Sequence, residues 1–135
     1  MGALHECSKS ARWISSPPSD DILNIFRETD YLCIITSKDA PSIKNLKIAL
    51  QILDQLKFPK ENIYVILNRA DSKVGITIEE IEETIQRKID VAIPSDRIVP
   101  ISVNKGIPVI LDVPRSAVAK SIYKLIRIIT EPKRR

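Results

Sequence analysis

Two short apolar runs, at positions 63–67 and 91–93, each end abruptly in polar residues. The residues that follow them are Asn68, Arg69, Pro94, Ser95 and Asp96. In an open parallel sheet, ligands bind beyond the carboxyl ends of the strands. The side-chain amide of Asn68 offers both a donor and an acceptor, which is what reading the N6/N7 edge of adenine requires. The spacing therefore predicts a purine-binding edge of a sheet.

The same residues also have purely structural explanations. Asn68 suits a strand-end turn in which its side chain bonds to nearby backbone. Asp96 can accept a hydrogen bond from a base or a ribose, or it can serve as a turn residue after Pro94. The residue types alone leave both interpretations open.

The chain lacks a glycine-rich phosphate loop. Its three glycines are at positions 2, 75 and 106, whereas a loop that cradles phosphates with backbone N–H groups needs glycines close together. The single histidine, His5, has no second histidine or paired cysteine at ligand spacing, so we predict no metal site and no catalytic residue. The pattern is a base site without a phosphate site.

The elements that position these residues alternate between strand and helix. We predict strands at 13–14, 31–35, 63–67 and 91–93, rich in β-branched residues and buried on both faces. Apolar residues at helical spacing predict helices around 22–26, 43–56, 78–85 and 116–130. Asp39 should cap the second helix, and Thr77 with Glu80 forms a capping box for the third. The fold class is α/β, with a mostly parallel sheet and flanking helices.

Composition predicts one globular domain. The chain has 135 residues, 44% of them hydrophobic, and a net charge of +4. We expect a flexible leader at 1–12, a single α/β domain at 13–131 and a basic tail at 132–135. Cys33 should pack as a small hydrophobe inside its strand. The apolar runs are too short to span a bilayer and no signal peptide is evident, so we expect a cytoplasmic protein.

From Trp13 onward the sequence resembles the carboxyl-terminal part of the ParA/MinD-type deviant-Walker ATPases, especially the CpaE-type branch linked to pilus assembly. The resemblance rests on four segments in order, at 15–18, 65–69, 93–96 and 103–108. Ser15, Ser16 and Pro17 stand where the family has Asp-Thr-Pro, a degenerate Walker-like strand end. The resemblance implies a partial, Rossmann-like P-loop NTPase fold that lacks the strand of the phosphate loop.

The resemblance also implies a ligand. An adenine nucleotide would lie between Asn68-Arg69 and Pro94-Ser95-Asp96, with Asn68 reading the base. Two departures weaken the phosphate side: the family's lysine-bearing loop has no counterpart, and Ser15 replaces the aspartate that organises magnesium. We therefore expect ATP or ADP with Mg²⁺ to bind weakly or not at all, and no hydrolysis by this chain alone.

These implications favour a non-catalytic interaction or dimerisation module related to pilus assembly or positioning. The missing strand would make the chain a homodimer, or would bring in a partner that supplies that strand. One alternative is a piece of an ATPase that binds nucleotide only together with an amino-terminal half. Another is a membrane- or DNA-binding surface on the last helix, although Lys120, Lys124 and Arg127 are better explained as its solvated face.

Overall fold

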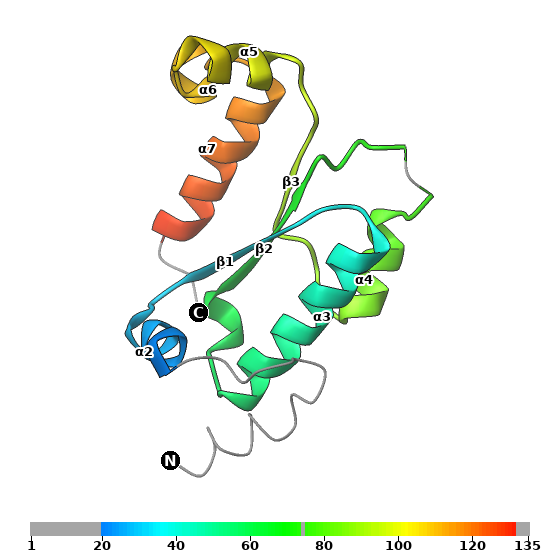
Figure 1. Ribbon diagram of the computed structural model, residues 1–135, viewed down its shortest axis with the longest axis vertical. Coiled ribbons are helices and arrows are strands. Elements are labelled where there is room, and N and C mark those ends of the chain that lie inside the picture. The colour runs from blue at the N-terminus through cyan, green and yellow to red at the C-terminus, as the bar shows by residue number, and fades with distance from the viewer. Residues whose placement is uncertain (1–19, 74, 132–135) are drawn as a thin grey trace.

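A computed structural model describes residues 20–73 and 75–131 of the chain (Figure 1). The predicted leader at 1–12, the strand at 13–14, the strand end of Ser15, Ser16 and Pro17, and the tail at 132–135 lie outside the described residues. The described elements, in chain order, are α2 (Asp20–Glu28), β1 (Leu32–Thr36), α3 (Ala40–Gln55), the 3-10 turn η1 (Lys60–Asn62), β2 (Ile63–Asn68), α4 (Ile78–Ile85), β3 (Val91–Ile93), α5 (Ile98–Lys105), α6 (Val109–Asp112) and α7 (Ala117–Thr130).

The described strands form a three-stranded parallel sheet in the order β1-β2-β3. The register pairs Ile34 with Val65 on one side of β2 and Ile66 with Val91 on the other. Because the strands are parallel and in sequence order, their carboxyl ends lie at one edge of the sheet. The parallel α/β class is therefore confirmed, and the strand predicted at 31–35 begins one residue later.

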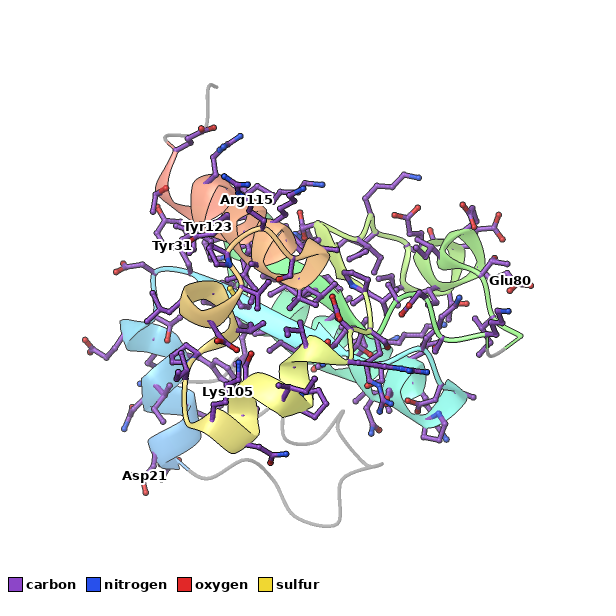
Figure 2. All side chains as sticks on the ribbon, turned by 90° about the horizontal axis from the view of Figure 1, so that it is seen from above. Asp21, Tyr31, Glu80, Lys105, Arg115 and Tyr123 are labelled. Atoms are coloured by element: carbon purple, nitrogen blue, oxygen red, sulfur yellow. The ribbon has the colours of Figure 1, made fainter. Side chains whose placement is uncertain are left out.

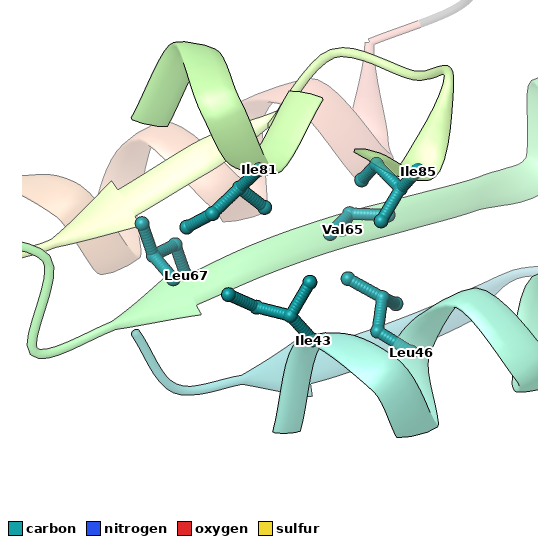
Figure 3. Packing of buried hydrophobic residues seen from close by; sticks show 6 residues of the cluster. All are labelled: Ile43, Leu46, Val65, Leu67, Ile81 and Ile85. Carbon is teal, nitrogen blue, oxygen red and sulfur yellow. The ribbon is translucent and has the colours of Figure 1, made fainter. Parts of the chain in front are cut away.

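The main core lies between β2 and the helices α3 and α4. Figure 3 shows side chains from these three elements meeting in one cluster, in which Ile81, Val65 and Leu67 are fully buried. The cluster is made of Ile43, Leu46, Val65, Leu67, Ile81 and Ile85. The opposite face of the sheet carries α7, which packs against β3 (Figure 1). Burying apolar surface contributes about 25 cal/mol per Å² to folding, and this contribution holds the layers together.

The helix starts follow the predicted capping residues. Asp39 accepts a hydrogen bond from the Ser42 backbone N–H at 2.9 Å. Thr77 and Glu80 form the complete capping box of α4. Gly106 ends α5 with φ +70°, a left-handed conformation that glycine adopts at little cost. The helices α5 and α6 were not predicted, because Pro100 and Pro108 punctuate the sequence there as they would in a loop.

The prediction that every strand is buried on both faces is wrong for β1. Its pairing places Cys33 and Ile35 on the same face as Tyr64 and Ile66. On β2 that face is buried, but on β1 Ile35 is 67% exposed and Cys33 is exposed as well. Because β1 is an edge of the described sheet and α7 packs over β3, nothing among the described residues covers this face of β1. Cys33 therefore does not pack as a core residue.

Candidate functional site

A cavity of about 730 Å³ opens at the carboxyl ends of β2 and β3. Its lining includes all five residues that the sequence assigned to the site: Asn68, Arg69, Pro94, Ser95 and Asp96. Small-molecule sites typically occupy about 300–1,000 Å³, so the cavity is large enough for a nucleoside. The residues singled out from two separate parts of the sequence thus meet in one pocket.

The pocket also has an apolar wall that the sequence analysis did not assign to it. Four elements contribute to this wall: β3, α5, α6 and α7. The apolar lining residues are Ile93, Val99, Pro100, Val109, Val118 and Ile122, and Arg97 adds a second cation beside Arg69. Val118 and Ile122 are one helical turn apart on the predicted apolar side of α7, which was the available signal. An apolar wall with a few polar groups suits an aromatic base.

Asn68 lines the pocket and is exposed. Its side-chain oxygen accepts a hydrogen bond from the Arg69 backbone N–H at 3.1 Å. This is the bond that the turn interpretation of Asn68 requires. The side-chain nitrogen makes no hydrogen bond to the described residues, so its two N–H groups remain available to a ligand. Arg69 itself has φ +55°, an unfavourable backbone conformation for a residue with a side chain.

Asp96 has a structural role at the start of α5. One of its carboxylate oxygens accepts the Ile98 backbone N–H at 3.0 Å, and its backbone carbonyl accepts that of Val99. Asp96 is half-buried in the pocket wall. It therefore fixes the loop as a turn residue, while its second oxygen makes no hydrogen bond within the described part of the chain.

The loops that follow the three strands are joined to one another. After β2, the backbone N–H of Ala70 donates to the carbonyl of Ile93 at 3.0 Å. The carboxylate of Asp71 accepts the backbone N–H of Ser95 at 2.7 Å. From the end of β1, the ammonium of Lys38 donates to the carbonyls of Ala70 and Ser72, at 3.4 and 3.3 Å. The hydrogen bonds from Ser95 lower the pKa of Asp71, and the charge of Lys38 adds to this.

A second set of polar contacts supports the apolar wall by tying α5 to α6. The hydroxyl of Ser102, which is buried, donates to the Asp112 carboxylate at 2.7 Å. The ammonium of Lys105 donates to both oxygens of the same carboxylate at 3.1 Å. The Ser102 hydroxyl, and then Lys105, lower the pKa of Asp112. These bonds hold the helices that carry Val99 and Val109.

Among the described residues, no cluster of potential metal ligands lies beside the pocket. The nearby carboxylates, Asp71 and Asp96, each accept a backbone N–H. No group of three or more His, Cys, Asp or Glu residues gathers anywhere in the described ranges. Ser15, Ser16 and Pro17, where the family's magnesium-organising aspartate would be, lie outside those ranges.

Three solved structures share the arrangement of these elements. A ParA family ATPase from Chlorobium tepidum TLS superimposes with a TM-score of 0.71 and 30% sequence identity, over 82% of this chain and 47% of that chain. The MinC:MinD cell division protein complex of Aquifex aeolicus contains a chain that matches with a TM-score of 0.69 and 20% identity, over 87% of this chain and 50% of that one. A structure of the MinD cell division protein from the same organism matches with a TM-score of 0.62 and 22% sequence identity, over 78% of this chain and 46% of that chain.

The described residues form part of a ParA/MinD-type P-loop ATPase fold. The chain spans about half the length of these solved structures. No protein-family model and no curated protein matches the sequence. Among the described helices, none combines the length and the apolar character needed to cross a bilayer.

Proposed function

We propose that this chain carries the adenine-binding side of a ParA/MinD-type ATPase domain and that it has no catalytic activity by itself. One observation carries the proposal. The five residues predicted to hold a base, drawn from two separate strand ends, line a single cavity whose remaining wall is apolar. The cavity lies at the carboxyl ends of parallel strands, where open α/β sheets bind ligands.

The pocket offers the two interactions that a purine needs. Its apolar wall, with Val99 and Val118, can contact the faces of the ring and remove them from water. The Asn68 side-chain nitrogen can donate to the ring nitrogen N7. Its oxygen, now bonded to the Arg69 backbone, can accept from the exocyclic amine. In this proposal the turn bond orients Asn68 before the base arrives.

The phosphate side supports no catalytic role for the described residues. Phosphoryl transfer depends on positioned cations and metal ions around the transferred group. The sequence contains no glycine-rich loop, and Asp71 and Asp96 each use one carboxylate oxygen to accept a backbone N–H. We therefore propose that ATP or ADP binds mainly through its base, with little contribution from Mg²⁺.

Calorimetric titration with adenosine tests the proposal, and guanosine serves as the comparison. We expect adenosine to bind more tightly than guanosine, and Asn68→Ala to weaken adenosine binding about tenfold, since a bidentate base contact is worth about 1–3 kcal/mol. Asn104→Ala is the matched control, because Asn104 is exposed on α5 and does not line the pocket. Absence of adenosine binding, or equal binding by Asn68→Ala, contradicts the proposal.

The partner that we propose is a second polypeptide segment that pairs with the outer side of β1, where no described residue pairs with it. It is supplied by a second copy of the chain or by an amino-terminal half that carries the missing strand. In support, β1 is an uncharged edge strand with exposed apolar residues on one face, and such edges favour strand addition. An interaction role in pilus assembly or positioning, in the cytoplasm, is the setting we propose from the CpaE-type resemblance.

Adding an amino-terminal half that contains a phosphate loop tests the second form of this partner. We expect nucleotide-dependent binding of the two pieces and restored ATP turnover, both abolished by Asn68→Ala. No association at micromolar concentrations, in the presence of ATP and Mg²⁺, would count against it.

A further inference from the structure

We propose that Asp71 is a positioning residue for the base pocket, and that it acts by holding the Ser95 backbone N–H. This inference rests on the proposed function, since it assigns a role in the same pocket. Asp71 does not line the cavity. It acts on the Pro94-Ser95-Asp96 loop indirectly, by accepting a hydrogen bond from the Ser95 backbone N–H at 2.7 Å.

The loop that Asp71 holds has few other anchors. Asp96 fastens its far end to the start of α5 through Ile98. The near end continues from β3, which has only three residues and whose last carbonyl, that of Ile93, accepts the Ala70 backbone N–H at 3.0 Å. Ser95 lies between these two points and is exposed. The bond to Asp71 therefore fixes the middle of a loop that forms one wall of the pocket.

The same bond, together with the backbone hydrogen bond from Ala70 to Ile93, links the two halves of the site. Asp71 belongs to the segment after β2, three residues beyond Asn68, whereas Ser95 belongs to the segment after β3. A carboxylate that joins these segments keeps Asn68 and the opposite wall at a constant separation. Affinity for a small ligand depends strongly on such preorganisation, because ordering a loop during binding reduces the net free energy of binding.

Lys38 connects the segment after β1, the outer strand of the described sheet, to the segment that carries Asp71. It follows β1, and its ammonium bonds to the carbonyls of Ala70 and Ser72, the two neighbours of Asp71. The positive charge also lies close enough to favour the ionised form of Asp71. The chain of contacts thus runs from the end of β1, across the segment after β2, to the segment after β3. We place Lys38 second in importance, because its bonds are long.

Two substitutions at Asp71 separate positioning from charge. In Asp71→Ala the acceptor is lost, and we expect adenosine affinity to fall about threefold to tenfold, a modest effect because the bond is exposed to water. Asp71→Asn keeps an acceptor oxygen and should restore most of the affinity. Lys38→Ala should have an effect smaller than that of Asp71→Ala.

Asp90 provides the matched control. Its carboxylate also accepts a backbone N–H across strands, from Val65 at 2.7 Å, but it precedes β3 and does not line the pocket. Asp90→Ala should lower the stability of the fold and leave adenosine affinity unchanged. Circular dichroism of every variant verifies folding, and hydrogen exchange should show a faster Ser95 amide in Asp71→Ala.

The outcomes distinguish this inference from the proposed function. If the unmodified chain does not bind adenosine, the proposed function is contradicted and the role of Asp71 falls with it. If the unmodified chain binds adenosine and Asp71→Ala binds it equally well, only the positioning role is overturned. An unchanged exchange rate for the Ser95 amide in Asp71→Ala also overturns it. A loss of affinity in Asp71→Ala that Asp71→Asn restores supports it.

Discussion

The two edges of the described sheet are built differently. At the β3 edge, α7 packs against the strand, and α5 and α6 complete the wall of a pocket. At the β1 edge, Cys33 and Ile35 are exposed on one face, and no strand among the described residues pairs with the outer side of β1. Figure 2 shows Tyr31 and Tyr123, both substantially exposed, on the same side of the molecule.

This difference between the two edges matches the two roles in the proposed function, base binding beside β3 and strand addition at β1. The residues that would hold a base lie on the side of the sheet where α5, α6 and α7 complete the pocket wall. In the proposal, a phosphate-loop strand from another segment pairs with β1, whose outer side has no partner strand among the described residues. A stable base pocket can therefore coexist with an open edge that another segment fills.

The largest contrast should appear in stability. Ile81 is fully buried in the core cluster, whereas Ile35 on β1 is 67% exposed. We expect Ile81→Ala to lower the free energy of unfolding by about 2–5 kcal/mol and Ile35→Ala to change it by less than about 0.5 kcal/mol. Urea unfolding followed by circular dichroism measures both. Comparable losses would mean that something covers the β1 edge.

Association through the β1 edge provides the second contrast. If a second copy pairs there, the mass of the chain measured by sedimentation should rise with protein concentration, and Ile35→Lys should suppress the rise. Val103→Lys is the control, since Val103 is 69% exposed on α5 and remote from the strand edge. A constant monomer mass for the unmodified chain would exclude self-pairing and leave the separate partner.

The Arg69 side chain should favour nucleotide binding, while its backbone conformation lowers the free energy of unfolding. With φ +55° it holds a conformation that costs about 1 kcal/mol or more for a residue with a Cβ. Arg69→Gly should therefore leave the free energy of unfolding unchanged or raise it by up to about 1 kcal/mol, while adenosine monophosphate affinity falls. Lys57→Gly, at φ +56° outside the pocket, should affect stability alone. Equal affinities for the unmodified chain and Arg69→Gly would argue against a role for Arg69 in binding.

Low pH should reduce the free energy of unfolding through Asp112, which joins α5 to α6, by less than the substitutions above. The pKa of Asp112 is lowered by Ser102 and Lys105. Because the carboxyl group has a higher pKa in the unfolded chain, about 3.9, its contribution to stability is complete at neutral pH. The contribution is lost as the pH falls through the lower, folded pKa. Urea unfolding across this range should show a smaller acid-induced loss for Asp112→Asn than for the unmodified chain.

The sequence predicted the parts of the fold that depend on local pattern. Helical periodicity and caps located α3, α4 and α7, and the polar residues after each apolar run located the pocket. It did not predict α5 and α6, because prolines that are tolerated in and near the first turn of a helix look like loop residues. The exposure of one face of β1 could not be predicted from the local sequence pattern either, because it depends on which elements pack against the sheet. The role of Asp71 required distances that spacing alone does not give.

Mapping the amide signals of the full chain by nuclear magnetic resonance during an adenosine titration tests the central claim most directly. The account predicts shifts at Asn68, Arg69, Ser95 and Asp96, with the signals of β1 unchanged. The same titration of Asn68→Ala should give smaller shifts at every concentration. Shifts that gather at β1, or an absence of shifts at the pocket, would contradict a base site at the carboxyl ends of β2 and β3.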